Sequence, residues 1–392
     1  MSGSPWDLRI LDPAPAVYPA GGIDSEVLMS CPKAFYTESE DVKPVFFEGM
    51  KHRGKSTRVF AYYGIPKVKP GEKVPGIVLV HGAGGTAYAS WVKLWMERGY
   101  AAIAVDLEGH QPGLPDDKNR WPRHAYAGPE NISLFEDYHE KAEDQFMYHA
   151  VANVMLAHSL LRSFPAVDGE RIGVTGISRG GIITSLVCGV DPRLTFGIPV
   201  YGCGYLYQMD SPAGRFIRSL GDASDRIRQL WDPSSYFHNV RIPMLWITGS
   251  NDIGCTVYHF SKSHASIQSE SILSIQYGLK HSHPHGWSPK EIYIFADSVT
   301  ANGLPLPRIV SQSCSGNRIS VRYTSVCKIT NAKLYYTLNA SNWYDLTWIE
   351  KDAVVEAVHE SVSAIVPDDA KAYFVNLTDE RRLTVSTDII LK

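Results

Sequence analysis

The sequence predicts an α/β fold, a mostly parallel sheet with helices on both faces, followed by a small antiparallel β-sandwich. Continuous apolar runs such as residues 76–80 and 101–105 are typical of strands buried on both faces. They alternate with helical segments such as residues 88–98, which indicates a parallel sheet. After residue 318 the chain becomes a series of short alternating segments with almost no helical periodicity, which favours the sandwich.

Changes in composition predict the domain bounds. Residues 1–43 are rich in Pro, Ala and Gly, and we expect them to form an extended arm on the surface. Residues 44–301 form the α/β domain and residues 306–392 the sandwich. The α/β domain carries insertions at about residues 107–139 and 202–240. Insertions between strands commonly form lids over a site.

Periodicity predicts the remaining elements of the α/β domain. The domain opens with a hairpin that turns near residues 52–55, and residues 143–163 form a long helix with one buried face. The last helix should begin with a capping box made by Ser288 and Glu291. Further strands are expected at residues 171–177, 194–201, 244–248 and 272–277.

Composition excludes some classes of partner. The 392 residues are 44% hydrophobic and 20% charged, which is ordinary for a globular protein. The net charge of −3 gives no attraction to nucleic acid or to an anionic membrane, and no apolar run is long enough to span a bilayer. The N-terminus has no basic segment followed by an apolar one. The sequence as it stands predicts a cytoplasmic protein, or a periplasmic or secreted one if a leader has been removed.

The six cysteines are sparse and form no C-x-x-C pair, which argues against a metal cage or a disulfide scaffold. Cys188 lies in an apolar helical segment and is expected in the core. Cys203 and Cys255 each follow a predicted strand at the same edge of the sheet. The sequence leaves open whether these two pair.

The central motif is R-I-G-V-T-G-I-S-R-G-G, residues 171–181. It predicts a strand, a sharp turn and the start of a helix, with Gly176 and Gly180 flanking Ser178 in the pattern G-x-S-x-G. Such a turn raises one hydroxyl above the edge of a sheet. Ser178 is therefore the candidate nucleophile, although a serine in a glycine-rich surface turn is the simpler alternative.

A serine nucleophile needs a base and an acid that orients the base. In this type of fold they follow the serine in the order acid, then histidine, each just after a strand. Asp252 and His281 occupy those positions. Asp106 and Glu108 also follow a strand, but they precede the serine.

The choice of histidine is less clear, because His281, His283 and His285 lie close together. In an extended segment all three would point to one side, and an H-x-H-x-H run can bind a metal. No carboxylate or cysteine stands nearby in the sequence to complete a metal shell. We expect His281 to be the base, His283 to be the alternative, and no metal or other cofactor to be needed.

Two backbone N–H groups are expected to stabilise the oxyanion. One belongs to Arg179, at the start of the helix after the serine, and the other to Ala83 in the loop H-G-A-G-G, residues 81–85. A phosphate-binding loop is the alternative for residues 81–85. The segment matches neither G-x-G-x-x-G nor a Walker pattern.

These motifs, together with H-S-H-P-H-G-W at residues 281–287, resemble α/β-hydrolases of the acetyl xylan esterase and dienelactone hydrolase-like group. The hairpin from residue 46 resembles that of bacterial members linked to polysaccharide breakdown, and residues 372–386 resemble the end of their C-terminal β-domain. The resemblance implies an α/β-hydrolase fold and ester hydrolysis through an acyl-enzyme, on acetylated sugars. Dienelactone hydrolases proper use a cysteine nucleophile, so the serine here favours an esterase.

The expected partner is a small acylated substrate, a carbohydrate by resemblance, and self-association is left open. Aromatic residues on loops near the catalytic edge are candidates for stacking on sugar rings, although each could equally anchor its loop. They are Trp121, Tyr205, Trp231 and Trp287. Arg179 could meet an acidic substrate group, but a neighbouring carboxylate is its commoner partner.

Two other functions remain as alternatives. The first is a serine peptidase of the prolyl oligopeptidase type, against which the stretch before His81 is too short for a propeller. The second is a non-catalytic carbohydrate-binding homologue, against which the complete set of nucleophile, acid and base argues. The sandwich is expected to be structural or dimerising, with glycan binding as its alternative role.

Overall fold

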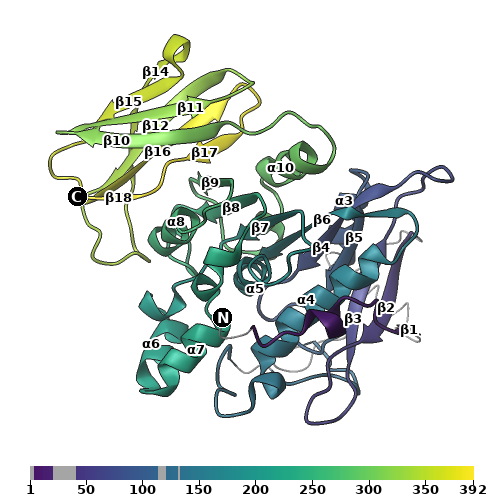
Figure 1. Cartoon of the computed structure of the whole chain (residues 1–392). Coiled ribbons are helices and arrows are strands. Elements are labelled where there is room, and N and C mark those ends of the chain that lie inside the picture. Colours follow the sequence, from purple (N-terminus) through teal and green to yellow (C-terminus); the bar gives the residue numbers. More distant parts are fainter. Residues whose placement is uncertain (1–3, 21–40, 114–120, 131–132) are drawn as a thin grey trace.

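The computed structural model describes residues 4–20, 41–113, 121–130 and 133–392, and in it an α/β domain and a β-sandwich lie side by side (Figure 1). In these residues the central sheet has nine strands in the order β1-β2-β3-β5-β4-β6-β7-β8-β9. The strands are β1 (Val17–Pro19), β2 (Val42–Glu48), β3 (Arg58–Gly64), β4 (Val74–Val80), β5 (Ala101–Val105), β6 (Val167–Ile177), β7 (Phe196–Val200), β8 (Met244–Gly249) and β9 (Ser271–Gln276).

Neighbouring strands pair in parallel along the order β5-β4-β6-β7-β8-β9. Along the order β1-β2-β3-β5 they pair antiparallel. An isolated bridge between His52 and Lys55 lies in the connection of the β2–β3 hairpin, as expected. Strands β4, β5 and β7 are buried on both faces over most of their length. The predicted mostly parallel sheet is therefore confirmed.

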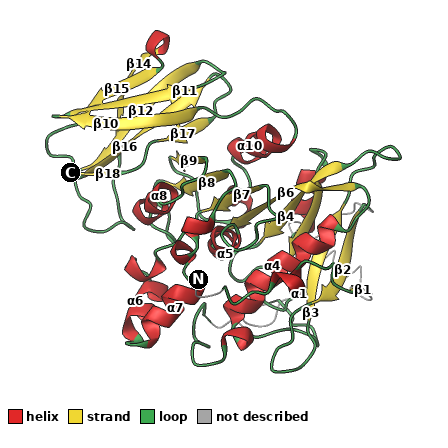
Figure 2. Ribbon diagram, in the orientation of Figure 1, coloured by secondary structure: helices red, strands yellow, loops and turns green. Residues whose placement is uncertain are grey.

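Helices cover both faces of this sheet (Figure 2). Apolar residues of α3 and α10 pack on one face, and those of α4, α5 and α8 pack on the other. The α-helices are α1 (Leu8–Leu11), α3 (Ala89–Met96), α4 (Phe146–Arg162), α5 (Arg179–Val187), α6 (Pro212–Ser219), α7 (Ala223–Trp231), α8 (Val257–Ala265), α9 (His283–Gly286) and α10 (Lys290–Thr300). Short 3₁₀ turns are η2 (Ala142–Asp144), η3 (Leu206–Gln208), η4 (Pro233–Ser235), η5 (Phe237–Asn239) and η6 (Ala357–His359). Within the described ranges, every helix is too short or too polar to cross a bilayer.

Helix α4 is buried on nearly all sides, not on the one face that its periodicity predicts. The N-terminal arm covers its outer face, because the Trp6 indole N–H donates to the Tyr148 carbonyl over 3.0 Å and the Ser159 hydroxyl donates to the Leu11 carbonyl. The described part of the arm is thus partly ordered as α1 and β1 and buries Trp6 and Leu11. Residues 4–20 therefore pack against the α/β domain, and Leu8–Leu11 within them form a short helix. Residues 21–40 of the expected arm lie outside the described residues.

The predicted capping box at Ser288 does not form. Pro289 stands at the N-cap of α10, and the Ser288 hydroxyl donates instead to the His285 carbonyl over 2.9 Å. Glu291 accepts the Thr384 N–H from the sandwich over 2.8 Å. A contact between the two domains has therefore replaced a local one, which no pattern within residues 288–291 could indicate.

The C-terminal region forms two antiparallel sheets, in the orders β10-β11-β15-β14 and β13-β12-β16-β17, with β18 pairing β16. Alternate residues of β11 are buried and exposed, as expected for one face turned to a shared core. The strands are β10 (Arg308–Ser315), β11 (Arg318–Thr324), β12 (Ile329–Thr337), β13 (Ile349–Asp352), β14 (Val354–Glu356), β15 (Ser361–Ile365), β16 (Ala372–Asp379), β17 (Thr384–Ser386) and β18 (Ile390–Leu391).

The sandwich covers the edge of the central sheet at β9 (Figure 1). The Ile275 N–H donates to the Ser386 hydroxyl over 2.7 Å, and the Asn376 side-chain amide donates to the Ile275 carbonyl over 3.0 Å. Edge strands leave such backbone groups without partners unless something covers them. Side chains of the sandwich thus complete the hydrogen bonding of β9.

The arm gives a first test of stability. Replacing Trp6 by Ala removes its packing against Tyr148, Trp231 and Tyr236 and its buried hydrogen bond. We expect the free energy of unfolding to fall by about 3–5 kcal/mol in urea titrations. Ile10→Ala is the matched control, because Ile10 is 57% exposed on the same arm and should change stability little. Equal effects of the two substitutions would show that the arm adds no specific packing.

Candidate active site

Ser178 stands in the sharp turn that the glycine pattern predicts, between β6 and α5. Its backbone has φ 58° and ψ −121°, a conformation that costs free energy for a residue with a Cβ. A Cβ at Gly180 would lie 2.2 Å from the Val80 carbonyl oxygen, so only glycine lets the helix start pass so close to β4. The turn therefore holds the hydroxyl in a fixed place by packing of the surrounding backbone.

Ser178, His281 and Asp252 are joined in one chain of hydrogen bonds. His281 Nδ1 lies 2.7 Å from Asp252 Oδ2, and His281 Nε2 lies 2.8 Å from Ser178 Oγ. Because a carboxylate only accepts, Nδ1 carries the proton and Nε2 is left to accept one from the serine hydroxyl. This is the arrangement that a general base requires.

Asp252 has no exposed side-chain surface, and its oxygens are fully used. Oδ2 faces His281, whereas Oδ1 accepts the backbone N–H groups of Gly254 over 2.8 Å and Cys255 over 2.9 Å. The loop after β8 thus wraps around the carboxylate. Its orientation toward the histidine depends on the backbone of residues 250–256.

The three neighbouring histidines point to three different partners, so the arrangement in which all three face one side of an extended segment does not occur. Residues 283–286 form the short helix α9, so the side chains diverge. His281 reaches Ser178, His283 Nε2 accepts the Gly82 N–H over 3.1 Å, and His285 Nδ1 lies 2.7 Å from the Ser282 hydroxyl. Pro284 fits the first turn of a helix, which is why the segment does not stay extended.

His283 is held neutral. Burial, with smaller contributions from His81 and His281, lowers the pKa of His283 to about 3. Its ring packs against Tyr88 at 4.6 Å between centroids. A group that stays unprotonated to such a low pH suits a hydrogen-bond acceptor for the loop of residues 81–85 better than a proton carrier near neutral pH.

The two expected oxyanion donors belong to segments that adjoin the serine. Arg179 is the first residue of α5, and Ala83 follows Gly82, where a Cβ would lie 3.2 Å from Ser178 Cβ. Gly84 donates its N–H to Glu108 over 3.2 Å and Gly85 donates to the Gly82 carbonyl. Among the described residues, the N–H of Ala83 has no acceptor, which leaves it available to a substrate.

Arg179 is paired with a neighbouring carboxylate, which the sequence analysis named as a commoner partner than an acidic group of the substrate. Its Nη1 lies 2.6 Å from Glu108 Oε1, the same oxygen that accepts the Gly84 N–H. The Arg123 guanidinium in turn donates to the Glu108 carbonyl. Glu108 therefore ties the nucleophile's helix to the loop of residues 81–85, a role that sequence order alone could not reveal.

The four aromatic residues proposed from the sequence lie in different surroundings. Trp231 is 1% exposed at the end of α7, where its indole N–H donates to Gln145 over 2.7 Å, so the structure does not place it on a loop facing the site. The hydroxyl of Tyr205 lies 2.7 Å from that of Ser266 beside α8. Trp121 is buried in an apolar core.

Trp287 is the aromatic residue with the closest link to the histidines. Its ring packs against Tyr88 at 5.3 Å and Trp91 at 5.1 Å, and Tyr88 itself contacts His283. Sequence analysis missed Tyr201, whose ring lies 4.3 Å from that of His281 and whose hydroxyl donates to the Ser282 carbonyl over 2.5 Å. Its position directly after β7 was the only available signal.

Cys203 and Cys255 are both buried free thiols, and they interact with each other. Burial, together with the neighbouring thiol, raises the pKa of Cys203 well above its ordinary value. The two strand ends therefore do bring these residues together. Cys188 is also a free, buried thiol, as its apolar surroundings indicate.

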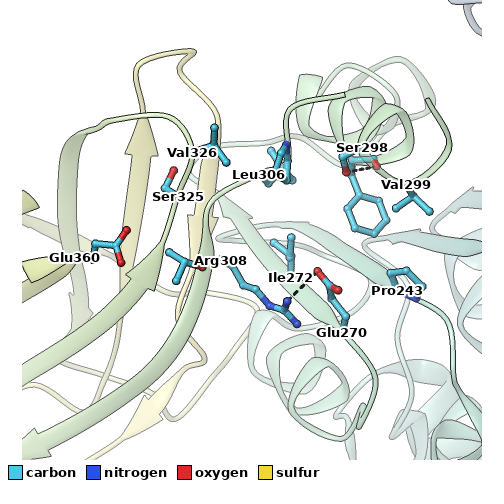
Figure 3. A pocket seen from close by; sticks show the side chains of 13 residues that line it. Pro243, Glu270, Ile272, Ser298, Val299, Leu306, Arg308, Ser325, Val326 and Glu360 are labelled. Atoms are coloured by element: carbon cyan, nitrogen blue, oxygen red, sulfur yellow. Dashed lines mark hydrogen bonds and ion pairs between the residues drawn. The ribbon is translucent and has the colours of Figure 1, made fainter. Parts of the chain in front are cut away.

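A cavity of about 620 Å³ lies between the two domains, away from the serine (Figure 3). Residues of both domains line it, and Arg308 of the sandwich pairs with Glu270 of the α/β domain over 3.2 Å. Neither Ser178, Asp252 nor His281 is among its lining residues. The cavity is separate from the candidate active site.

Two family models match the chain. That of acetyl xylan esterase (AXE1) matches residues 31–208, and that of the prolyl oligopeptidase family matches residues 134–297. The acetyl esterase Axe7A of Xylanibacter ruminicola is 26% identical over 144 residues, which cover 36% of this chain and 32% of that protein. The match thus spans about a third of that relative's length.

Solved structures show the same fold. An acetyl xylan esterase from Paenibacillus sp. R4 aligns with a TM-score of 0.55 and 17% identity, over 75% of this chain and all of the other. An acylaminoacyl peptidase of Pyrococcus horikoshii aligns with a TM-score of 0.51 and 21% identity, over 67% of this chain and 43% of the other. These structures share the fold of this chain. The resemblance to acetyl xylan esterases that the sequence predicts is confirmed by the family model and by the match to Axe7A.

The neutral state of His283 predicts a pH dependence of stability. Below pH 6.5 the unfolded chain binds a proton at this residue, whereas the folded protein binds none until about pH 3. Stability is therefore lost as the pH falls through this window. Between pH 6.5 and 5 we expect the wild type to lose about 1–2 kcal/mol more than His283→Gln in urea titrations.

The matched control for this test is His285→Gln, because His285 is exposed in the same segment. It should keep the pH dependence of the wild type. A His283→Gln variant with that same dependence would contradict the neutral buried state.

Proposed function

We propose that this chain is a serine carboxylesterase that removes short acyl groups, acetyl above all, from carbohydrates through an acyl-enzyme. The observation that carries the proposal is the hydrogen-bonded chain Ser178–His281–Asp252 at the ends of three strands. The similarity to acetyl esterases and acetyl xylan esterases supports the ester bond and the sugar as substrate.

In the first half of the reaction Ser178 Oγ attacks the ester carbonyl while His281 Nε2 accepts the hydroxyl proton. Asp252 keeps the imidazole in the required tautomer and stabilises the imidazolium that forms. In such a triad the carboxylate does not take the proton itself. The second oxygen of Asp252 accepts two backbone N–H groups, which fixes the orientation of the carboxylate. His281 then gives the proton to the departing sugar hydroxyl.

The negative charge that develops on the carbonyl oxygen falls between the N–H groups of Ala83 and Arg179. The N-terminus of α5 adds a favourable dipole at this point. In the second half of the reaction a water molecule, deprotonated by His281, attacks the acyl-enzyme through the same oxyanion site. The acyl–Ser178 bond then breaks, His281 returns the proton to Ser178 Oγ, and the carboxylic acid is released.

His283 serves this reaction by holding the oxyanion loop. Its Nε2 accepts the Gly82 N–H, so the loop that carries Ala83 is fastened to the segment that carries His281. The base and one oxyanion donor then keep a fixed spacing. We assign His283 this positioning role, and His281 the role of base.

A peptidase is the second candidate function, because the prolyl oligopeptidase family model covers residues 134–297. Both functions use the same three residues. They differ in the leaving group, an alcohol in one case and an amine in the other. The rates on matched acetyl esters and peptide amides therefore distinguish them.

The proposal is tested with p-nitrophenyl esters and acetylated xylan. We expect Ser178→Ala to lower kcat/KM at least about 10³-fold, since it removes the nucleophile. Ser288→Ala changes an exposed serine after the segment of His281, and as the control it should remain active. Wild type should hydrolyse acetyl esters faster than longer esters and faster than peptide amides. Undiminished turnover by Ser178→Ala would refute the mechanism.

The two histidines give a second test. His281→Ala should lower kcat at least about 10³-fold because it removes the base. His283→Gln keeps an acceptor for Gly82 and should lose no more than about tenfold, whereas His283→Leu should lose about 10²-fold. The acid limb of the pH–rate profile should persist in both His283 variants. Its disappearance in His283→Gln would instead make His283 the base.

A further inference from the structure

The loop that joins β12 to β13, residues 338–348, leaves the sandwich and lies against the α/β domain. Leu346 and Trp348 of this loop are buried and belong to the same apolar core as Trp246 and Phe260 of β8 and α8. Figure 1 shows the sandwich lying beside α8 and β9. The loop is therefore part of the packing of the α/β domain.

Two hydrogen bonds connect this loop to the two residues that precede Asp252. The Trp348 indole N–H donates to the Ser250 carbonyl over 3.0 Å in a buried contact. The Asn251 side-chain amide donates to the Leu346 carbonyl over 2.6 Å. These bonds fix the backbone where the chain leaves β8 and turns toward the carboxylate.

A third contact holds the other side of the same segment. Trp343 stacks on Tyr258 at 5.0 Å between centroids, with an angle of 22° between the rings. Tyr258 lies in the first turn of α8, just after the loop that carries Asp252. The sandwich thus contacts the segment of residues 250–256 at its start and just after its end.

The segment between these contacts is an irregular loop. Ser250, Asp252, Cys255 and Thr256 are buried, whereas Ile253, next to Asp252, is 71% exposed. Yet Gly254 and Cys255 must present their N–H groups to the carboxylate while Asp252 faces His281. A displacement of about 1 Å at such a group can cost a large part of the rate.

We propose that the β12–β13 loop of the sandwich is a positioning element for the acid Asp252. Trp348 of this loop and Asn251 of the α/β domain are the positioning residues. This inference rests on the proposed function. The sandwich acts through residues 250–256 and touches neither the substrate nor His281. It sets how well Asp252 orients the base, so its effect falls on kcat rather than on the binding of a small ester.

The test uses Trp348→Phe in the full chain. Phe keeps an aromatic ring against Phe374, which Trp348 contacts at 5.0 Å, and loses only the N–H donor and part of the ring. We expect kcat on p-nitrophenyl acetate to fall about 5- to 50-fold with KM within about twofold of the wild type. The acid limb of the pH–rate profile should move to lower pH, because a displaced Asp252 stabilises the imidazolium less.

The matched control is Val321→Ala, a fully buried residue of β11, which belongs to the other sheet of the sandwich than β12, β13 and β16. It should lower the melting temperature of the sandwich without changing kcat. A second variant, Asn251→Ala, removes the side-chain amide that donates to the Leu346 carbonyl, and it should show the same pattern as Trp348→Phe to a smaller degree. The proposal is overturned if both positioning variants keep wild-type kcat, or if Val321→Ala lowers kcat as much as they do.

A readout without substrate separates this inference from the proposed function. The Nδ1 proton of His281, bonded to Asp252, should give a far-downfield proton NMR resonance in the wild type and in Val321→Ala. It should move upfield or vanish in Trp348→Phe. That result without any esterase activity would overturn the proposed function alone. An unchanged resonance in Trp348→Phe would overturn the positioning role.

Discussion

The close packing of backbone around Ser178 is the constraint on which the rest of the site depends. The serine keeps a costly conformation only because β4, the start of α5 and the end of β7 pass within contact of each other. A Cβ at Gly180 or at Gly202 would meet backbone oxygens at 2.2–2.3 Å. The hydroxyl therefore has one position, and the other groups of the site are arranged around that position.

The segment of residues 281–287 contacts the serine turn and the loop of residues 81–85 through two different histidines. His281 turns to the serine, and two residues later His283 turns to Gly82 in the loop beside it. The short helix α9 makes this division possible, since it sends neighbouring side chains in different directions. His281 is the proposed base. Burial lowers the pKa of His283 to about 3, so His283 acts only as a hydrogen-bond acceptor. Chemically equal residues thus acquire different roles from their surroundings.

The sequence predicted the parallel sheet, the serine turn and the order of Ser178, Asp252 and His281, because these depend on local patterns at strand ends. It could not predict what depends on a distant segment. Helix α4 has the periodicity of one buried face, but the arm buries the other. Glu291 sits where a capping box expects it, yet it bonds to the sandwich. Trp231 looks like a loop aromatic and is instead enclosed beside Trp6.

The sandwich is bound to the α/β domain where the base and the acid are carried. Strand β9 is an edge strand that leads into the segment of His281, and the sandwich satisfies its free backbone groups at Ile275 through Ser386 and Asn376. An uncovered edge would be open to unwanted pairing and to fraying. The neighbouring loop of Asp252 is held by the same domain. The segments of His281 and Asp252, the proposed base and acid, thus both make hydrogen-bonded contacts near the sandwich, in addition to the covalent connection between the domains.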